Sequence, residues 1–514
     1  TIAAKMTDVP GHTRSIIDPM YDAGIRLLHV GINSACPLPS VPTFCRWRSP
    51  SGNDLLLVYQ KDYGEDEVLP DGKTVVRINF TGDNHGPHSY ERVKKIYADL
   101  RKRYPQAQLV GASFNDVARE LLLIKKDLPV VTSEIGDTWI FGYGGAPIRM
   151  AKFRAVSRLY SQWLNEGKIK KDSDAALDFA AELGLIAEHT QGVDVKTHLR
   201  QWDKYDMDKF LKGRSEGVFS MAEASWKEID NYIDSAIAFL PASLQKEARE
   251  VVAEVDKVKL EDNSKMKPMK GRGGDQPIAG GMTLAGLSYQ MFDGDDYDDF
   301  QNRYLRARYG WALDDLGKRG LKESHAVSVT LYAQTMAQSV RKEKKGTRII
   351  TELRFPENEK VDKRVYPERI QVNFTTKNGK RSEVALTIYG KPAVRLPESY
   401  WLSFTVPGIE SVIAEKMGER VNLMDVVEKG NRQMHGIDRY VDLITSGETI
   451  RISSKEAFLL NVGEAQGLNY STNYPDKRKG AHFNLNNNLW GTNFSMWNEG
   501  SLTYHFVIET LNRK

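Results

Sequence analysis

The chain of 514 residues has little cysteine, no long apolar run and almost no net charge. Two cysteines cannot form a disulfide scaffold for a chain of this size. No stretch of about 18 consecutive apolar residues occurs, so no membrane-spanning helix is predicted. Lys and Arg number 72 against 68 Asp and Glu, and this balance argues against a dedicated nucleic-acid binder, in which clustered basic residues dominate. Hydrophobic residues make up 40% and charged residues 27%, which is typical of a globular protein.

The chain also lacks the short motifs of several enzyme classes. It contains no Gly-x-Gly-x-x-Gly, no Walker A sequence, no Gly-x-Ser-x-Gly and no Cys-x-x-Cys. Nucleotide cofactors and serine-hydrolase chemistry therefore have no support in the sequence. The acidic run at 293–299 does not have the spacing of a calcium-binding loop, and we interpret it as a solvated turn.

The two cysteines, Cys36 and Cys45, lie in a proline-rich segment. Either they form a disulfide, which is typical of a periplasmic or secreted protein, or they are free thiols, as expected in the cytoplasm. The sequence leaves both interpretations open, because the Cα separation decides whether a disulfide can form.

Length and pattern predict a multidomain protein, since roughly 150 residues per domain gives about three domains. Residues 1–146 alternate short apolar runs, for example 75–80 and 108–112, with helical patterns. Such alternation is typical of βαβ units around a parallel sheet, and we expect a partial (β/α)7-type barrel here. Residues 147–262 have apolar positions three and four apart, which predicts a helical bundle.

The rest of the chain has a different pattern. Residues 263–277 are rich in Gly and Lys without periodicity, and we expect a linker or loop. From 278 to 514 strand patterns dominate, which predicts an antiparallel β-sandwich region. Its clearest element is a hairpin in which apolar residues alternate on both sides of Asn378-Gly379.

Polar residues follow two of the predicted N-terminal strands, where parallel α/β folds place their chemistry. The first strand ends in Asp8-Val-Pro-Gly-His12, in which Asp8 either faces a pocket or caps the next helix. The strand at 75–80 is followed by Asp83-Asn84-His85, whose polar density favours a functional site over a plain loop. Paired carboxylates with a His suit general acid–base work, a metal site or both.

Three further segments offer candidate site residues. Asp137, Trp139 and Tyr143 follow the last strand of the N-terminal region, and an aromatic face beside polar groups suits either a sugar site or the core. His189 follows a predicted helix, where a cation interacts favourably with the helix dipole. Asn33 and the loop around Asn493 are candidate substrate contacts.

Together these motifs resemble glycoside hydrolase family 38, the α-mannosidase-like enzymes, and most closely an uncharacterised branch of that superfamily. Asp8-Val-Pro-Gly-His12-Thr13 is similar to the family's Asp-Pro-Phe-Gly-His-Ser, and Thr81-Gly-Asp83-Asn84 to its Gly-Ser-Asp-Phe. Leu183-Gly-Leu-Ile-Ala-Glu-His189 has the spacing of the family's metal-binding segment. The branch-level motifs include Glu134-Ile-Gly-Asp-Thr-Trp-Ile and Leu489-Trp-Gly-Thr-Asn-Phe.

The resemblance implies a metal-dependent retaining glycoside hydrolase that acts on a carbohydrate. It implies Asp8 as nucleophile, Asp83 as acid/base, and Asp8 and His189 as ligands of a divalent metal, zinc in this family. The remaining candidates are implied substrate contacts: His12, Asn33, Asn84, His85, Asp137, Trp139, Tyr143 and Asn493. Nothing in the sequence points to a nucleic acid or a membrane as a partner.

Family members carry a His-x-Asp strand that supplies two more metal ligands, and no His-x-Asp occurs in this sequence. We therefore expect that strand to be a separate N-terminal segment or to be absent, and the metal to be weakly held or absent in this chain alone, because closed zinc sites need about three or four ligands. Two other functions stay open: a polysaccharide deacetylase on a related barrel, and a non-catalytic carbohydrate-binding protein.

Overall fold

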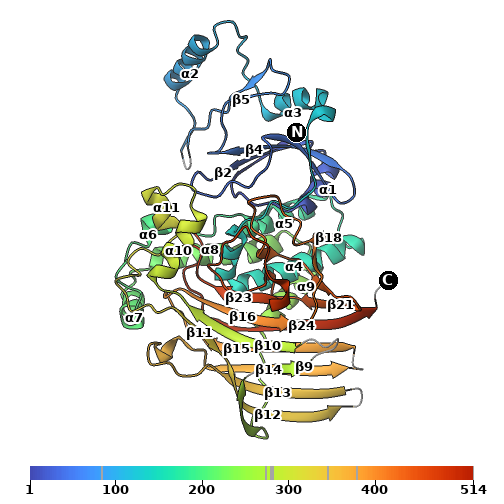
Figure 1. Ribbon diagram of the computed structural model, residues 1–514, viewed down its shortest axis with the longest axis vertical. Helices are drawn as coiled ribbons and strands as arrows, with labels where there is room; N and C mark the ends of the chain where they lie inside the picture. The colour runs from blue at the N-terminus through green and yellow to red at the C-terminus, as the bar shows by residue number, and fades with distance from the viewer. Residues whose placement is uncertain (83–84, 273–274, 278–282, 344–345, 378–379, 513–514) are drawn as a thin grey trace. The chain divides into compact units, whose positions relative to one another are not determined.

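The computed structural model describes residues 1–82, 85–272, 275–277, 283–343, 346–377 and 380–512 (Figure 1). The chain forms two compact units. Unit 1 comprises residues 1–136 and 427–430, and unit 2 comprises residues 137–426 and 431–514. The predicted fold class is confirmed: a parallel α/β region comes first, then helices, then large antiparallel sheets. No helix among the described residues is long and apolar enough to cross a membrane.

Unit 1 is built on a five-stranded, mostly parallel sheet of strand order β1-β2-β4-β3-β7. β1 pairs in parallel with β2, and β2 with β4, so their carboxyl ends share one edge of the sheet. The inner strands β2 and β4 are almost wholly buried, which explains their continuous apolar runs. The strands are β1 (Ala3–Asp8), β2 (Leu27–Ile32), β3 (Phe44–Arg48), β4 (Asp54–Lys61) and β7 (Val130–Val131), with a separate pair β5 (Glu67–Val68) and β6 (Val75–Val76).

Helices cover the two faces of this sheet. Ile17 of α1 (Ile17–Asp22) packs with Val30 and Tyr59 on one face. Leu121 of α3 (Phe114–Leu123) packs with Leu56 on the other. The third helix of the unit, α2 (Tyr90–Arg103), has no buried residue, and Figure 1 shows it apart from the sheet.

Unit 2 begins with helices packed on one another, as predicted. Their core contains Trp163, Phe179, Ile233 and Ile237. The helices are α4 (Pro147–Asn165), α5 (Asp174–Gly184), α6 (Val195–His198), α7 (Met207–Ser215), α8 (Ser220–Ala238) and α9 (Ala242–Asp256), with α10 (Gly294–Tyr304) and α11 (Gly310–Asp315) further along; the 3-10 helices η3 (Trp139–Gly145) and η4 (Leu185–Ala187) precede α4 and follow α5.

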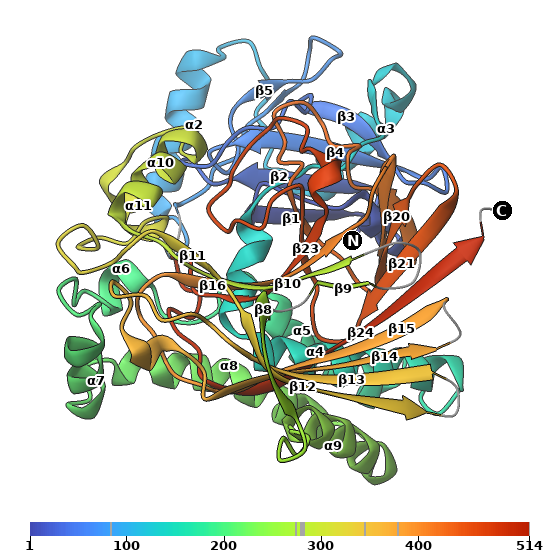
Figure 2. The same ribbon diagram turned by 60° about the horizontal axis from the view of Figure 1, so that its bottom comes forward.

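Two large antiparallel sheets complete unit 2. The ten-stranded sheet has the order β18-β17-β20-β21-β24-β15-β14-β13-β12-β8, and Figure 2 shows β12 to β15 and β24 side by side. The seven-stranded sheet has the order β11-β10-β16-β23-β22-β19, with β9 beside β10. The predicted hairpin is β14 (Arg369–Lys377) and β15 (Arg381–Lys391), in which Val372 lies opposite Leu386; its Asn378-Gly379 turn lies outside the described residues.

The remaining strands are listed here with their bounds: β8 (Lys267–Arg272), β9 (Asp275–Pro277), β10 (Thr283–Met291), β11 (Val329–Tyr332), β12 (Gln334–Glu343), β13 (Gly346–Arg354), β16 (Glu398–Thr405), β17 (Ser411–Lys416), β18 (Glu419–Asn422), β19 (Met434–Gly436), β20 (Tyr440–Ile444), β21 (Glu448–Ser454), β22 (Leu459–Val462), β23 (Ala481–Asn487) and β24 (Gly500–Asn512).

Several local predictions differ from the structure. Residues 108–112 form no strand, and Val110 is 69% exposed, so this apolar run is not part of the buried sheet. Of residues 75–80 only Val75–Val76 is a strand. The acidic run forms the start of α10. The Asp293 side chain caps the helix, and the Asp296 side chain accepts a hydrogen bond from the backbone N–H of Asp293.

Two more segments are now placed. Residues 263–277, expected to be a linker or loop, contain β8, an edge strand of the ten-stranded sheet, and β9, which pairs with β10 of the seven-stranded sheet. Cys36 and Cys45 are both buried and are not disulfide-bonded, and burial raises the pKa of Cys45 to about 12. The disulfide alternative is therefore not realised in this structure.

Candidate functional site

Asp8 is the last residue of β1 and lies at the carboxyl edge of the parallel sheet of unit 1. Its backbone φ is +92°, a conformation that few residues other than glycine adopt. Two side chains hold its carboxylate: Asn33 donates from Nδ2 to Oδ1 at 2.8 Å, and the Tyr63 hydroxyl donates to the same oxygen at 2.7 Å. The backbone N–H of Asn33 also donates to the carbonyl of Asp8 at 2.9 Å. The sheet therefore presents one carboxylate in a fixed orientation.

Tyr63 reaches Asp8 from a tight turn after β4. Asp62 and Tyr63 both have positive φ, at 54° and 66°, and Gly64 follows at 127°. Strained residues of this kind persist where the surrounding structure holds them in place, and they gather at functional sites. Here the strained turn and the strained Asp8 meet at a single carboxylate oxygen.

Two neighbours hold the turn in position. Gly31 of β2 lies directly under it, since a Cβ on Gly31 would stand 2.7 Å from Tyr63 Cα. Lys5 of β1 donates from Nζ to the Tyr63 carbonyl at 3.2 Å and lies 3.0 Å from Nδ1 of the buried His29. Burial lowers the pKa of Lys5 to about 8 and that of His29 to about 4.

The other predicted residues of unit 1 have separate environments. His12 forms a backbone bridge with Ile135, and its Nδ1 is buried without a hydrogen-bond partner among the described residues. Burial lowers the pKa of His12 to about 4, so the imidazole is neutral at pH 7. His85 is exposed. Asp83 and Asn84, the implied acid/base and its neighbour, lie outside the described residues.

In unit 2 the structure brings five predicted residues together around the segment 186–191. The rings of Trp139 and His189 have centroids 6.1 Å apart. The Tyr143 hydroxyl donates to the carbonyls of Ala187 and Glu188, at 2.7 and 3.1 Å.

The other two predicted residues, Asn493 and Asp137, are linked to this group by hydrogen bonds from backbone N–H groups. Asn493 accepts at Oδ1 from the backbone N–H of Gln191 at 3.1 Å. Asp137 accepts from the backbone N–H of Trp139 at 2.9 Å. The five residues therefore form one cluster, which includes His189.

Two charged groups in this cluster have strongly shifted pKa values. Nδ1 of His189 lies 2.6 Å from Oε1 of Glu188, and this hydrogen bond lowers the pKa of the Glu188 carboxyl to about 2. Asp137 is buried and accepts a hydrogen bond from the Tyr304 hydroxyl at 3.0 Å. Burial raises the pKa of Asp137 to about 7, although its hydrogen bonds act in the other direction.

The raised pKa of Asp137 predicts a pH effect on stability. A carboxyl with a folded pKa near 7 and an unfolded pKa near 3.9 favours folding at low pH, and this contribution is lost as pH rises from about 4 to 7. Asp137→Asn should remove that loss, so the variant should gain on the order of 3–4 kcal/mol relative to wild type between pH 4 and pH 8. Urea unfolding of both proteins across this range measures the difference, and parallel pH profiles would contradict the prediction.

Two aromatic residues that pack against this cluster, Trp490 and Tyr304, were not among the predicted site residues. Trp490 packs 6.1 Å from Trp139 and 5.5 Å from Tyr304, between ring centroids. Trp490 lies within the motif that starts at Leu489, so the sequence contained a clue to it. Tyr304 is the last residue of α10, and no pattern linked it to Asp137.

The family resemblance implies a divalent metal with Asp8 and His189 among its ligands. Among the described residues, no group of three or more His, Cys, Asp or Glu side chains is placed to hold a metal ion. Oδ1 of Asp8 accepts from an amide and a phenol, which are hydrogen-bond donors, and His189 pairs with Glu188. Within each unit, the described residues therefore supply no complete zinc site, and no step of the mechanism below involves a metal.

Comparisons with known proteins agree with this architecture. Residues 144–273, which contain α4 to α9, match the family model described as a domain of unknown function (DUF5054). No curated protein matches the chain. Among solved structures the chain is similar to an α-mannosidase from Enterococcus faecalis V583, with a TM-score of 0.53, 10% identity, and coverage of 100% of this chain and 74% of the other.

A second similar structure is a protein in the glycosyl hydrolase family 38 from Enterococcus faecalis, with a TM-score of 0.43, 10% identity, and coverage of 99% and 73%. At 10% identity the α-mannosidase likeness shows the fold alone. The chain thus has a fold like that of an α-mannosidase, with a strained Asp at the carboxyl edge of its parallel sheet.

Proposed function

We propose that the protein is a retaining glycoside hydrolase, with Asp8 as nucleophile and a carbohydrate of the α-mannoside type as substrate. The observation that carries the proposal is the Asp8 carboxylate, which is fixed by Asn33 and Tyr63 at the carboxyl edge of the parallel sheet. A nucleophile needs a fixed orientation toward the anomeric carbon, and orientation by hydrogen bonds supplies it. The α-mannosidase-like fold supports the choice of substrate class.

In the proposed reaction a carboxylate oxygen of Asp8 attacks the anomeric carbon, and the bond to the leaving oxygen breaks. Asp83 gives its proton to that oxygen, then takes a proton from the water that hydrolyses the glycosyl ester. Retaining enzymes of this kind hold the two carboxyls about 5–5.5 Å apart. Asn33 and Tyr63 keep the Asp8 carboxylate in place as its charge is lost and regained.

Trapping the intermediate tests this function. An activated fluorosugar of the α-mannoside series should leave a covalent adduct on the peptide that carries Asp8, which mass spectrometry locates. A deacetylase would release acetate from an acetylated glycan and form no adduct. A non-catalytic binding protein would show neither reaction, and either result would overturn the proposal.

Tyr63 supplies a smaller test of the same geometry. Tyr63→Phe removes one hydrogen bond to a charged acceptor, which is worth about 1.5–3 kcal/mol. We expect kcat/KM for an aryl α-mannoside to fall about 10- to 100-fold, while thermal unfolding shows that the variant is still folded. Tyr90→Phe is the control, because Tyr90 is 74% exposed on α2. Equal activity of both variants would show that Tyr63 does not orient the nucleophile.

A further inference from the structure

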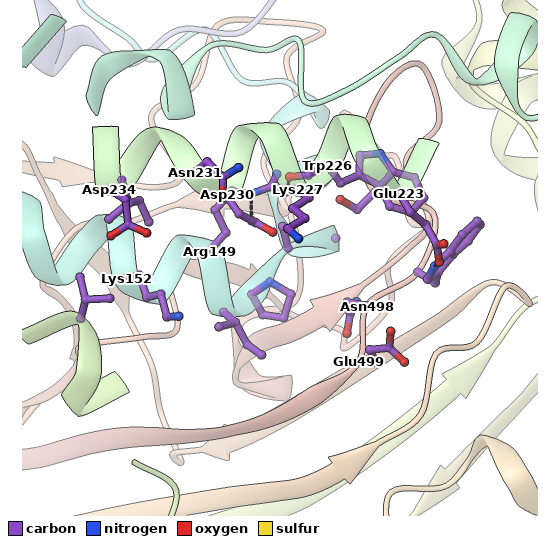
Figure 3. Close-up of a pocket in the computed structure, with 18 of the residues that line it drawn as sticks. Arg149, Lys152, Glu223, Trp226, Lys227, Asp230, Asn231, Asp234, Asn498 and Glu499 are labelled. Atoms are coloured by element: carbon purple, nitrogen blue, oxygen red, sulfur yellow. Dashed lines mark hydrogen bonds and ion pairs between the residues drawn. The ribbon is translucent and has the colours of Figure 1, made fainter. Parts of the chain in front are cut away.

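Unit 2 contains a cavity of about 680 Å³ that none of the site residues above lines (Figure 3). α8 forms one wall, the first turns of α4 form another, and the segment 495–499 before β24 closes a third side. The volume is that of an ordinary small-molecule site. All of its walls belong to the same compact unit.

One face of α8 points into this cavity. Glu223, Lys227, Asp230 and Asp234 are spaced by four, three and four residues, so they share one side of the helix. Figure 3 shows Lys227 and Asp230 facing the first turns of α4, with Asn498 and Glu499 across the cavity.

Ion pairs hold part of the lining in place. Arg149 has a side chain only 3% exposed, and it donates from Nε to Asp230 at 2.5 Å and from Nη2 to the Trp226 carbonyl at 2.7 Å. Arg214 donates to Glu223 at 2.7 Å and to Glu499 at 2.7 Å. These five groups are fixed before any ligand enters.

Three polar side chains on α8 take no part in these ion pairs. Lys227, Asn231 and Asp234 have no hydrogen bond or ion pair with any other residue that the structure describes. Between them they offer donors on Lys227 and Asn231 and acceptors on Asn231 and Asp234.

The composition of the lining selects the ligand. Four acidic and four basic side chains line the cavity, so its formal charge is zero and it attracts neither anions nor cations as a class. Available donors and acceptors occur together, which suits hydroxyl groups, since each hydroxyl both donates and accepts. Ile148, Ile233 and the indoles of Trp226 and Trp497 add apolar surface for C–H groups.

We propose that this cavity binds a neutral saccharide through Lys227, Asn231 and Asp234 of α8. The proposal adds a second carbohydrate site to the proposed hydrolase and does not depend on Asp8. Such a site would hold a glycan chain on unit 2 whether or not its bonds are cleaved.

Hydrogen–deuterium exchange of the full chain tests the proposal, with α-1,2-mannobiose as the neutral probe. We expect the probe to protect peptides covering 223–234 and 495–499. Asn231→Ala with Asp234→Asn should raise the probe concentration for half-protection of these peptides about tenfold or more. Glu228→Gln with Ser235→Ala is the matched control, because these α8 residues do not line the cavity, and its titration should equal that of wild type.

Three results would overturn the proposal. The first is no protection of these peptides at any probe concentration, and the second is equal protection in the Asn231/Asp234 variant. The third is protection by inorganic phosphate in place of mannobiose, which would make the cavity an anion site. Asp8→Asn should leave the protection unchanged, so failure of the hydrolase proposal and failure of this one are separate outcomes. Thermal unfolding checks that each variant is folded.

Discussion

Replacing Asp8 by Asn is expected to lower the turnover of an aryl α-mannoside by about 10⁴-fold or more, because the amide cannot form the glycosyl ester. Asn has the same shape as Asp and adopts positive φ more readily than most residues, so it can keep the +92° backbone angle. Its amide oxygen can still accept from Asn33 and Tyr63. We therefore expect the melting temperature to stay within a few degrees of wild type.

A second substitution at the same position sharpens the test. Asp8→Gly removes the carboxylate and tolerates the same backbone angle, because glycine adopts positive φ without strain. Added azide should then enter the vacated space and attack the anomeric carbon of an activated substrate, giving a glycosyl azide of inverted configuration. Asp8→Asn with near wild-type turnover, or Asp8→Gly without azide product, would show that Asp8 is not the nucleophile.

The position of Asp8 could be predicted because it depends on local pattern. An apolar run predicts a strand, parallel strands place their carboxyl ends at one edge, and the residue after the run then lies at that edge. Asn33 follows from the same rule one strand along the sheet, and the two side chains are hydrogen-bonded in the structure. Sequence reasoning succeeds here because pairing of neighbouring strands leaves little freedom.

Tyr63 could not be predicted in the same way. It reaches Asp8 from a turn in which Asp62 and Tyr63 both have positive φ, and a tyrosine seldom adopts that conformation. Nothing in the local sequence requires such a turn, because contacts with Gly31 and Lys5 of other strands hold it. The strand predicted at 108–112 is wrong because a long-range contact is missing. The run has strand propensity but no partner strand among the described residues.

The cluster of unit 2 that includes His189 was predicted in part from short sequence motifs. Asp137, Trp139 and His189 belong to motifs that are far apart in the sequence, 137–139 and 183–189, and they lie in one part of unit 2. Tyr304 and Trp490, which complete the packing around Asp137 and Trp139, come from segments far along the chain. Such long-range pairs depend on tertiary packing, which a single sequence does not reveal.

Gly31→Ala is expected to lower both activity and stability. The added Cβ would stand 2.7 Å from Tyr63 Cα and 2.8 Å from its carbonyl carbon. Because the clashing atoms are backbone, no side-chain rotation relieves the contact, and the turn must move. We expect a loss of stability of about 1–3 kcal/mol from overpacking. The Tyr63 hydroxyl should also leave Asp8, with a fall in kcat/KM at least as large as that of Tyr63→Phe.

A double substitution separates the two effects of Gly31→Ala. If the loss of activity acts through Tyr63, adding Gly31→Ala to Tyr63→Phe should lower kcat/KM little further, since the hydrogen bond is already absent. Gly310→Ala is the control for the substitution itself, because a Cβ there meets open space. If the fold-loss in kcat/KM of the double variant equals the product of the two single losses, Gly31 supports Asp8 by a route other than Tyr63. The pairing of β2 with β1 is one such route.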